Sequence, residues 1–303
     1  MLVDTDALPV PGQRPPRPEA TAVLMADPEH FDVEYVINPH MEGNVGNVDR
    51  ALAKRQWGAL RDTYAALGLT VHVLPGQPGL PDLVFTANQS FPVRTPDGRW
   101  TVIMSRMRST HRHPEVDVVE SFYAERGAHI LHLPPDLGTF ESCGDCRWHP
   151  GRALIYGGHG FRTKASALRF VAETLDVPVV PLELVDPRFY HLDTCLAPLT
   201  EHAALVVEEA FTPEGLATLR TCFPELIPVP PVEAAHGFAA NGNCPDGKHF
   251  IMHRGNTQTR TNVERLGLDV IEVDTSEFIK SGGSVFCMSM MLRPPTDAAH
   301  SPS

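Results

Sequence analysis

One thiol lies in an apolar run near the C-terminus, in a setting that suits either packing or catalysis. The run reads EFIKSGGSVFCMSMMLRPP over residues 277–295, and Cys287 follows a pair of glycines. A free cysteine is among the most buried residue types and often packs as a small hydrophobic side chain. As a thiolate, the same group is a strong nucleophile when a general acid or base lies beside it. Whether Cys287 is a nucleophile or part of the core therefore depends on partners elsewhere in the chain.

A histidine and two acidic residues could supply those partners. In FYHLDTCLAPL (189–199), His191 and Asp193 alternate with Leu192, so a strand here would turn both polar side chains to one face. An imidazole beside a carboxylate suits a general acid or base next to a site for a cation. In GTFESCGDCRW (138–148), Glu141 follows an aromatic residue and precedes a glycine turn. We expect this carboxylate to be held in place, where it could orient the histidine or accept a proton.

Two other groups of reactive residues are weaker candidates. Cys143 and Cys146 form a C-x-x-C pair, which alone could be a redox pair or half of a zinc site. The sequence lacks a second such pair or a spaced histidine pair, and Glu141 and Asp145 share the loop. We therefore predict no metal and no other cofactor. The histidine-rich THRHP (110–114) fits a solvated loop better than a cluster of ligands.

The elements that must position these residues repeat along the chain. A helical pattern that ends near a glycine or turn is followed by a short β-branched strand, at intervals of roughly 40 to 60 residues. The five copies are LGLTVHVLP (67–75), RGAHILHLP (126–134), LDVPVVPLE (175–183), PELIPVPP (224–231) and LGLDVIEVD (266–274). Further apolar strands such as TVIMS and KHFIMHR lie between the modules. The simplest architecture is an α/β fold of five ββαβ modules around a central axis, a pseudo-symmetric propeller, and an ordinary open α/β sheet is the alternative.

Composition indicates a globular, acidic protein. The 303 residues are 42% hydrophobic and 20% charged, which favours a packed core over disorder. We expect one catalytic domain over residues 21–294, between a mobile proline-rich arm at 1–20 and a tail at 295–303. The formal net charge is −12, with 25 basic and 37 acidic residues. Such a surface would repel a phosphate backbone and attract a small cationic substrate, so nucleic acid is not an expected partner.

The cellular setting is predicted from cysteines and hydropathy. The six cysteines are scattered through a long chain without a secretory pattern at its start, which favours reduced thiols and a cytoplasmic location. No apolar stretch reaches the roughly 18 residues that a membrane helix needs, so no membrane association is expected. A homo-oligomer remains possible.

The ordered motifs resemble those of the guanidine-modifying amidinotransferase superfamily. They are PDLVFTAN, FESCGD, GFRT, HLDT and EFIKSGGSVFC, within about residues 22–292. This superfamily includes arginine deiminases, dimethylarginine dimethylaminohydrolases, arginine and succinylarginine dihydrolases, and glycine amidinotransferases. The run HFDVEYVINPHMEGN (30–44), together with FTAN and FYHLDTC, most resembles the arginine dihydrolase type. The resemblance implies a propeller of five α/β modules.

The resemblance also implies catalytic roles at matching positions. Cys287 would attack the guanidinium carbon of the substrate. His191 would carry protons to the departing ammonia and from the hydrolytic water, with Glu141 in support. Asp193 would bind guanidinium nitrogens.

Further positions are implied to bind substrate. Arg106 in MSRMR and Arg162 in GFRT match positions that clamp the substrate's carboxylate, a task that suits a forked guanidinium. Asn38, in the N-terminal run, is another candidate. Asn88 stands where deiminases place a second guanidinium-binding aspartate, which bears on how far the reaction goes. A second departure is Ser142-Cys143, which replaces a smaller pair before Gly-Asp.

These observations lead to a hydrolase that breaks C–N bonds of arginine, or of a close analogue, through a covalent thiouronium on cysteine. Hydrolysis twice would give ornithine, carbon dioxide and ammonia. One alternative is an arginine deiminase or dimethylarginine dimethylaminohydrolase, which stops at citrulline. A second alternative is a catalytically inactive protein that binds arginine in the same pocket.

Overall fold

The computed structural model describes residue 2, residues 20–95 and residues 98–293. The expected N-terminal arm and C-terminal tail lie outside these residues, apart from Leu2 and Ala20. The strands are β1 (Ala22–Ala26), β2 (Thr70–Leu74), β3 (Ser90–Arg94), β4 (Trp100–Met104), β5 (His129–His132), β6 (Cys146–Trp148), β7 (Ile155–His159), β8 (Val179–Glu183), β9 (Leu196–Pro198), β10 (Ala203–Val206), β11 (Glu225–Pro228), β12 (His249–His253), β13 (Asp269–Val273) and β14 (Met290–Leu292). The α-helices are α1 (Arg50–Ala66), α2 (His113–Ala124), α3 (Ala165–Leu175), α4 (Pro213–Cys222), α5 (Pro231–Gly237), α6 (Thr257–Glu264) and α7 (Ser276–Ile279).

Each module arranges an antiparallel strand, a central strand and a parallel strand around one helix. In the module β3–β4–α2–β5, β4 pairs antiparallel with β3 and parallel with β5. The same pattern recurs in β6–β7–α3–β8 and in β9–β10–α4–β11. Around α6, β12 pairs parallel with β13, and an antiparallel bridge between Asn243 and Ile251 takes the place of the first strand. The prediction of repeated ββαβ modules is therefore confirmed, and the described strands form separate small sheets rather than one open sheet.

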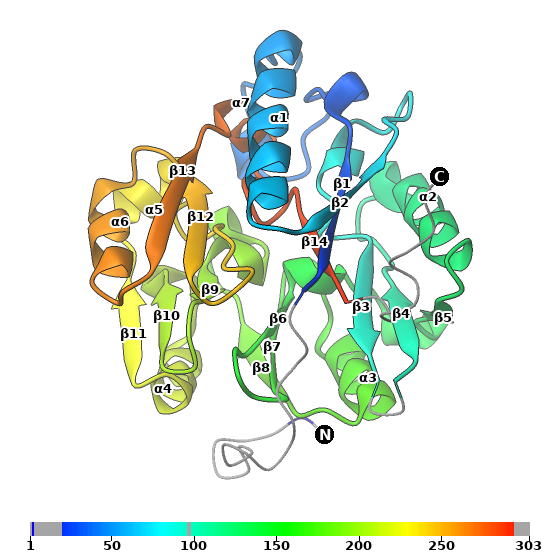
Figure 1. The fold of residues 1–303 in the computed structure, drawn as a ribbon. Helices are drawn as coiled ribbons and strands as arrows, with labels where there is room; N and C mark the ends of the chain where they lie inside the picture. Colours follow the sequence, from blue (N-terminus) through cyan, green and yellow to red (C-terminus); the bar gives the residue numbers. More distant parts are fainter. Residues whose placement is uncertain (1, 3–19, 96–97, 294–303) are drawn as a thin grey trace.

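The remaining module joins the two ends of the described chain. β1 pairs parallel with β2, across α1, and antiparallel with β14. The register places Ala22 opposite Leu292 and Leu24 opposite Met290. In Figure 1, β1 (blue) and β14 (red) lie side by side, and the other modules follow one another around the molecule. The pairing closes the ring of modules and fixes the chain that leads into β14.

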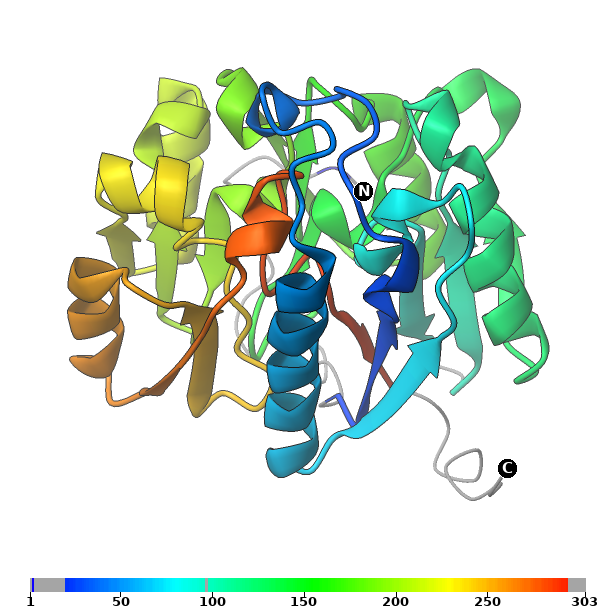
Figure 2. The same ribbon diagram turned by 90° about the horizontal axis from the view of Figure 1, so that it is seen from above.

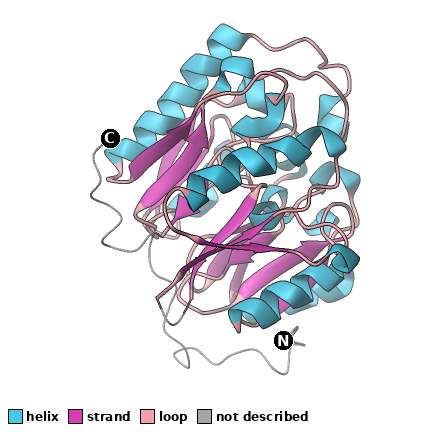
Figure 3. Ribbon diagram, turned by 90° about the vertical axis from the view of Figure 1, so that its right-hand side faces the viewer, coloured by secondary structure: helices cyan, strands magenta, loops and turns pink. Residues whose placement is uncertain are grey.

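The module helices lie toward the outside of the molecule, and the core lies between neighbouring modules. Figure 2 shows α1 (blue), α2 (green) and α6 (orange) at the periphery, and Figure 3 shows helices on the outer side of the strands. One apolar cluster packs β1 and β14 against β4 and α2, and another packs β3 and β4 against β7, β8 and α3. Burial of apolar surface at each junction stabilises a module only together with its neighbours.

The repeated phrases are the third strands of the modules, β2, β5, β8, β11 and β13. In three of them the turn after the helix holds a glycine with positive φ, namely Gly68 (+84°), Gly127 (+72°) and Gly267 (+81°). Glycine adopts this left-handed conformation readily, so it ends a helix and redirects the chain into a strand. Asp176 has a left-handed φ at the corresponding place before β8.

Among the described residues, no helix is long and apolar enough to cross a membrane. The cytoplasmic location, the absence of a nucleic-acid partner and the possible homo-oligomer stay predictions.

Candidate active site

Polar residues from all five modules lie in or beside one pocket, each in the segment that leads into the first strand of its module. These residues are Asn88 before β3, Glu141 before β6, His191 and Asp193 before β9, Asn241 before the Asn243 bridge, and Cys287 before β14. Three of the segments contain short 3-10 helices, Pro81–Val84, Ser142–Gly144 and Leu192–Thr194. Equivalent positions in successive modules thus face a shared centre, as the repeat pattern predicts.

The segment HLDT differs from its predicted structure. The strand prediction is wrong here, because Leu192–Thr194 is a 3-10 helix with His191 at its N-terminal flank, and β9 begins only at Leu196. The backbone N–H of Thr194 donates to the carbonyl of His191, 3.1 Å away, which closes the turn. The turn directs His191 toward Glu141 and Asp193 toward Cys287.

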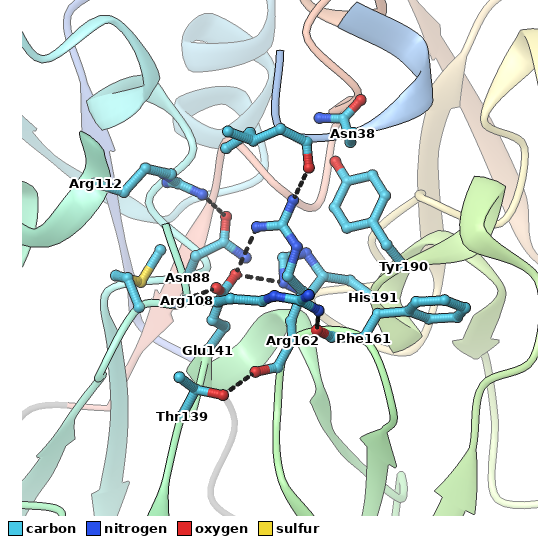
Figure 4. A network of polar contacts seen from close by, with 12 residues as sticks. Asn38, Asn88, Arg108, Arg112, Thr139, Glu141, Phe161, Arg162, Tyr190 and His191 are labelled. Carbon is cyan, nitrogen blue, oxygen red and sulfur yellow. Dashed lines mark hydrogen bonds and ion pairs between the residues drawn. The ribbon is translucent and has the colours of Figure 1, made fainter. Parts of the chain in front are cut away.

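His191 and Glu141 form a buried pair. The Nε2 atom of His191 lies 2.7 Å from Oε2 of Glu141. Nη1 of Arg162 donates to the same oxygen over 3.3 Å, and the backbone N–H of Arg108 donates to Oε1 over 2.9 Å (Figure 4). Burial alone would raise the pKa of Glu141, but Arg162 and His191 outweigh it and hold this pKa below its ordinary range. Glu141 is thus a fixed anion beside an imidazole.

Cys287 lies against Asp193 and Asn241. Its thiol donates to Oδ2 of Asp193 over 3.2 Å, and Nδ2 of Asn241 donates to the sulfur over 3.2 Å. Oδ1 of Asn241 accepts from the backbone N–H groups of Ser284 (3.0 Å) and Cys287 (3.4 Å), so one amide fixes both the thiol and its loop.

Asp193 disfavours the thiolate of Cys287, whereas the hydrogen bond from the thiol favours the charged form of Asp193. Burial raises the pKa of Cys287, and the neighbouring Asp193 raises it further. Burial also raises the pKa of Asp193 to about 7, against the opposing effect of Arg147. A cation bound beside both groups would favour the thiolate and the carboxylate together. The site therefore has the polarity to receive a positively charged substrate.

Asn88 is held in one orientation by Arg112. Nη1 of Arg112 donates to Oδ1 of Asn88 over 3.0 Å, while Glu115 pairs with the same guanidinium over 2.8 Å. The buried Nδ2 of Asn88 has no hydrogen-bond partner among the described residues, and Asn88 lines the inner pocket. The Oδ1 acceptor of Asn88 is therefore occupied by Arg112, whereas its Nδ2 donor is available to a ligand in the inner pocket.

The inner pocket opens into a wider mouth. The inner pocket, of about 20 Å³, is lined by Asn88, His191 and Cys287, and by Asp82, whose carboxylate accepts from Tyr35 and Ser281. The adjacent mouth, of about 430 Å³, is lined by Arg108, Arg162, Phe161 and Tyr190, among others. The narrow inner pocket suits a small planar head group, and the mouth suits the rest of an amino acid.

Asn38 and Arg162 lie where the inner pocket meets the mouth, and both line the two spaces. Arg162 packs over the ring of Tyr190 at 4.7 Å and donates to the carbonyl of Ile37 over 2.8 Å. Oδ1 of Asn38 accepts from two backbone N–H groups, and its Nδ2 donates to the carbonyl of Ser281 over 3.0 Å. Asn38 therefore builds the wall of the pocket with all of its polar atoms engaged.

Arg106 is not brought to this pocket. Its guanidinium donates to the backbone carbonyls of Leu133 (2.6 Å), Pro134 (2.9 Å) and Gly138 (3.4 Å). Arg106 lines neither the inner pocket nor the mouth, and both of its Nη atoms donate to these carbonyls, so the geometry does not support the prediction that Arg106 clamps the substrate's carboxylate. Arg108, two residues later, lines the mouth instead and reaches the carbonyl of Phe161.

The C-x-x-C pair lies outside the inner pocket. Neither Cys143 nor Cys146 forms a disulfide, and the sulfur of Cys143 lies 3.7 Å from that of Met290. Within the part of the chain that the structure describes, no group of three or more histidine, cysteine or acidic side chains is arranged to hold a metal ion. Ser142, just before Cys143, has a left-handed φ of +50°.

Comparison with known proteins places this geometry in a family. The family described as eukaryotic N,N-dimethylarginine dimethylhydrolase matches residues 32–293. The chain is 33% identical over 276 residues to ArgZ of Synechocystis sp., a bifunctional arginine dihydrolase/ornithine cyclodeaminase, across 90% of this chain. It is 33% identical over 287 residues to the N(G),N(G)-dimethylarginine dimethylaminohydrolase of Mycobacterium tuberculosis, across 94% of this chain and 89% of that protein. The chain belongs to the guanidine-modifying superfamily.

Solved structures of this superfamily share the fold. The N-terminal domain of a substrate-bound ArgZ variant superposes with a TM-score of 0.85 at 32% identity, over 90% of this chain and 98% of that domain. A dimethylarginine dimethylaminohydrolase with an S-methyl-L-thiocitrulline adduct gives 0.74 at 26% identity, over 90% of this chain and 100% of that one. The chain spans 38% of the length of the bifunctional ArgZ. These relatives are hydrolases of guanidino compounds, which confirms the predicted superfamily, propeller fold and enzyme class.

Four residues in or beside the pocket were not singled out from the sequence, although the motifs that contain them, or the repeat, could have indicated them. Asp82 is part of the motif PDLVFTAN, and Arg108 follows Arg106 in MSRMR. Arg112 belongs to THRHP, predicted as a solvated loop, yet it is only 4% exposed. Asn241 lies in AANGN, just before the strand-like bridge of its module. The five-fold repeat would have located Asn241, because its segment is equivalent to those of Asn88 and Cys287.

We expect the free enzyme to keep Cys287 protonated at neutral pH. Its alkylation by iodoacetamide, followed by mass spectrometry of the Cys287 peptide, should therefore still accelerate above about pH 8.5, the ordinary pKa of a thiol. Asp193→Asn removes the negative neighbour and should shift this profile to lower pH. A wild-type profile that is already flat at neutral pH, or one that Asp193→Asn leaves unchanged, would contradict the assigned electrostatics.

Only glycine fits at position 144. A Cβ atom there would lie 2.4 Å from Nδ2 of Asn88 and 3.3 Å from the ring of His191. Gly144→Ala should therefore displace both side chains and lower kcat/KM about 100-fold, since small misplacements at a reacting centre have effects of this size. Gly58→Ala in α1 is the matched control, because its Cβ would meet nothing within 4 Å. Equal activity of the two variants would exclude a role for the Gly144 contact.

Proposed function

We propose that the chain is an arginine dihydrolase, which hydrolyses arginine to ornithine, carbon dioxide and two ammonia molecules. The observation that carries this proposal is the orientation of Asn88, whose amide presents a hydrogen-bond donor to the inner pocket. The relatives of this chain, ArgZ and AgrE, are named as bifunctional enzymes with arginine dihydrolase activity. The first hydrolysis requires a nucleophile and a proton donor, and the second requires that the intermediate product be retained.

In the first hydrolysis, Cys287 attacks the guanidinium carbon. The substrate cation binds beside Asp193, which favours the thiolate of Cys287 at the moment when it is needed. His191 donates a proton to the departing ammonia, and a thiouronium on Cys287 results. His191 then takes a proton from the attacking water, while Glu141, 2.7 Å from Nε2, complements the charge on the imidazolium. The product of this step is citrulline.

The second hydrolysis depends on the polarity of Asn88. A guanidinium group is a donor only, whereas the ureido group of citrulline has a carbonyl oxygen that accepts hydrogen bonds. The free N–H of Asn88 matches that oxygen, and Arg112 prevents the amide from turning its own oxygen into the pocket. Citrulline is therefore held for a second attack by Cys287 instead of being released.

The amino-acid end of the substrate extends into the mouth. Arg108 and Arg162 both line the mouth and present positive charge where an α-carboxylate would lie. Because Arg162 also contacts Glu141, binding of the substrate's carboxylate to Arg162 would affect the pair formed by His191 and Glu141. This arrangement favours free arginine over a guanidino compound without a carboxylate.

A second candidate is the hydrolysis of Nω,Nω-dimethylarginine to citrulline and dimethylamine. It is favoured by the family match over residues 32–293 and by the relative from Mycobacterium tuberculosis. Both candidates use Cys287, His191 and Glu141 in the same way, so the products distinguish them.

We expect purified protein incubated with arginine to form ornithine with about two ammonia per arginine, with citrulline scarce. Amino-acid analysis by mass spectrometry, alongside an ammonia assay, measures both. Cys287→Ser should abolish turnover while the thermal unfolding curve stays close to that of the wild type, because a hydroxyl is a poor nucleophile of similar size. Accumulation of citrulline with one ammonia per arginine would favour the deiminase alternative. Turnover of dimethylarginine alone would favour the second candidate, and binding of arginine without turnover would indicate an inactive binding protein.

Asn88→Asp should shift the products toward citrulline. An aspartate retains the contact with Arg112 but presents an acceptor to the pocket, which favours the cationic substrate over the neutral ureido group. We expect most of the output to be citrulline, with consumption of arginine retained. If Asn88→Asp still forms ornithine as its main product, the polarity of this side chain does not decide the second step.

Arg112→Lys tests the anchor of the amide separately. Lysine keeps a positive charge near Glu115 but cannot bridge Glu115 and Asn88 with a rigid fork. We expect a larger fraction of citrulline in the products, because Asn88 is then free to rotate. Arg50→Lys, which alters an exposed ion pair with Asp32, is the control and should leave the product ratio unchanged. The same product ratio in both variants would remove Arg112 from the proposal.

A further inference from the structure

A buried guanidinium lies next to the segment that carries Cys287, outside the pocket. Arg147 of β6 is only 6% exposed, and its guanidinium packs over the ring of Phe286, 3.4 Å from the ring centroid. Phe286 immediately precedes Cys287 in the chain. The antiparallel pairing of β6 with β7, with Arg147 opposite Tyr156, fixes the backbone that carries the cation. Arg147 lines neither the inner pocket nor the mouth, so it lies outside the space that a substrate would occupy.

Hydrogen bonds join Phe286 to the thiol and its carboxylate. The backbone N–H of Phe286 donates to the carbonyl of Asn241 over 3.0 Å. Nδ2 of Asn241 donates to the carbonyl of Asp193 over 2.9 Å and to the sulfur of Cys287 over 3.2 Å. The thiol donates to Oδ2 of Asp193 over 3.2 Å. The aromatic ring under the guanidinium therefore belongs to the same hydrogen-bonded unit as Asp193 and Cys287, which fixes the cation relative to both groups.

The charge of Arg147 is balanced by the two ionisable groups of this unit. Burial lowers the pKa of Arg147 to about 10, against the opposing effects of Asp193 and Cys287, so the group is a cation at neutral pH. In return, Arg147 is the foremost influence that opposes the effect of burial on the pKa of Asp193. When Asp193 and Cys287 are both ionised they carry two negative charges, and Arg147 supplies one positive charge. The guanidinium of a bound substrate would supply the second.

The thiol and the phenols that also face this unit carry no positive charge. Tyr64 of α1 and Cys143 face Arg147, and Tyr190 faces Cys287. Burial raises the pKa of Tyr64 to about 12 and that of Tyr190 well above its ordinary value, so both phenols are neutral at physiological pH. Cys143 favours the cationic form of Arg147, but it lies outside the inner pocket.

Other basic groups near the pair are engaged by glutamates. Arg112 also favours the carboxylate of Asp193, but it pairs with Glu115 over 2.8 Å. His191, in the inner pocket, lies 2.7 Å from Glu141. The charges of these groups are thus offset by glutamates, whereas Asp193 is the carboxylate that favours the charge of the guanidinium on β6.

We propose that Arg147 is a charge-balancing residue of the active site, which favours the carboxylate of Asp193 and the thiolate of Cys287 from outside the substrate pocket. This inference rests on the proposed role of Cys287 as the nucleophile. Before a substrate binds, Arg147 favours an ionised Asp193, which is the form that receives a guanidinium. When that second cation binds, the two positive charges match the two negative charges, and the thiolate is favoured. Because Arg147 acts through these groups and lines neither part of the pocket, it is a positioning residue.

The pH dependence of the alkylation of Cys287 by iodoacetamide, followed by mass spectrometry of the Cys287 peptide, tests this role. Arg147→Met removes the charge, while its thioether can still pack on the ring of Phe286. Loss of a nearby cation disfavours both anions, so we expect the profile to move to higher pH by about one pH unit. This direction is opposite to that expected for Asp193→Asn. An unchanged profile would overturn the proposal, and Arg147→Gln provides the same measurement should Arg147→Met fail to fold.

Two further variants separate charge from packing, with circular dichroism as the check that each is folded. Arg147→Lys keeps the positive charge and should retain the wild-type profile near neutral pH. Arg293→Gln is the matched control, because Arg293 is also 6% exposed and lines the same cavity of about 470 Å³ as Arg147, yet the ionisable group that its charge meets is Cys143. We expect its profile to match that of the wild type. A shift in either variant as large as that of Arg147→Met would assign the effect to packing and overturn the proposal.

The alkylation measurement is independent of the products that the enzyme forms. Iodoacetamide reports on the ionisation of Cys287 without turnover, so the expected shift is the same whether the protein forms ornithine, forms citrulline or only binds arginine. Failure of the proposed dihydrolase reaction would therefore appear in the product analysis alone, and failure of the role of Arg147 in the alkylation profile alone.

Discussion

The antiparallel pairing of β14 with β1 is the constraint on which the site depends. It joins the end of the described chain to its beginning, so that the fifth module is built from both ends. Cys287 precedes β14 by three residues, and its carbonyl accepts from the backbone N–H of Ala87, 3.1 Å away, next to Asn88. Cys287 is thus fixed to the neighbouring module as well as to its own. A thiol on a free chain end could not be held against Asp193 and Asn241 in this way.

Closure of the ring also explains how the buried charges of the site are paired. Each module contributes one or two polar groups, and the pocket can bury them because neighbouring modules supply the partners. Glu141 pairs with Arg162 and His191, and Arg112 pairs with Glu115, so these anions and cations offset one another. Asp193 differs, because its nearest side-chain partner is the thiol of Cys287. The incomplete charge balance at this pair leaves a place for a cation, which the proposed substrate would provide.

The sequence predicted the architecture better than the contacts. The recurrence of Gly68, Gly127 and Gly267 before β-branched strands reports local backbone requirements, which a sequence records directly. By contrast, the chain from His191 to Asp193 is too short to distinguish a strand from a 3-10 turn by alternation alone. The difference between Arg106 and Arg108 is also invisible in the sequence, because it depends on the carbonyls of residues 133–138, which arrive from another part of the module. Local periodicity therefore identified the modules, whereas long-range packing decided which side chain faces the pocket.

The anchoring of Asn88 suggests how one scaffold can support either one hydrolysis or two. Arg112 uses only one acceptor of the residue at position 88, and an aspartate could satisfy it equally well. The remaining atom would then be an acceptor in place of a donor, with no change in the helix that carries Arg112 or in its pairing with Glu115. Under the proposed function, a change in the number of hydrolytic steps would therefore require no change of fold, nucleophile or proton carrier. It would require only that the side-chain atom of residue 88 that faces the substrate change from a hydrogen-bond donor to an acceptor.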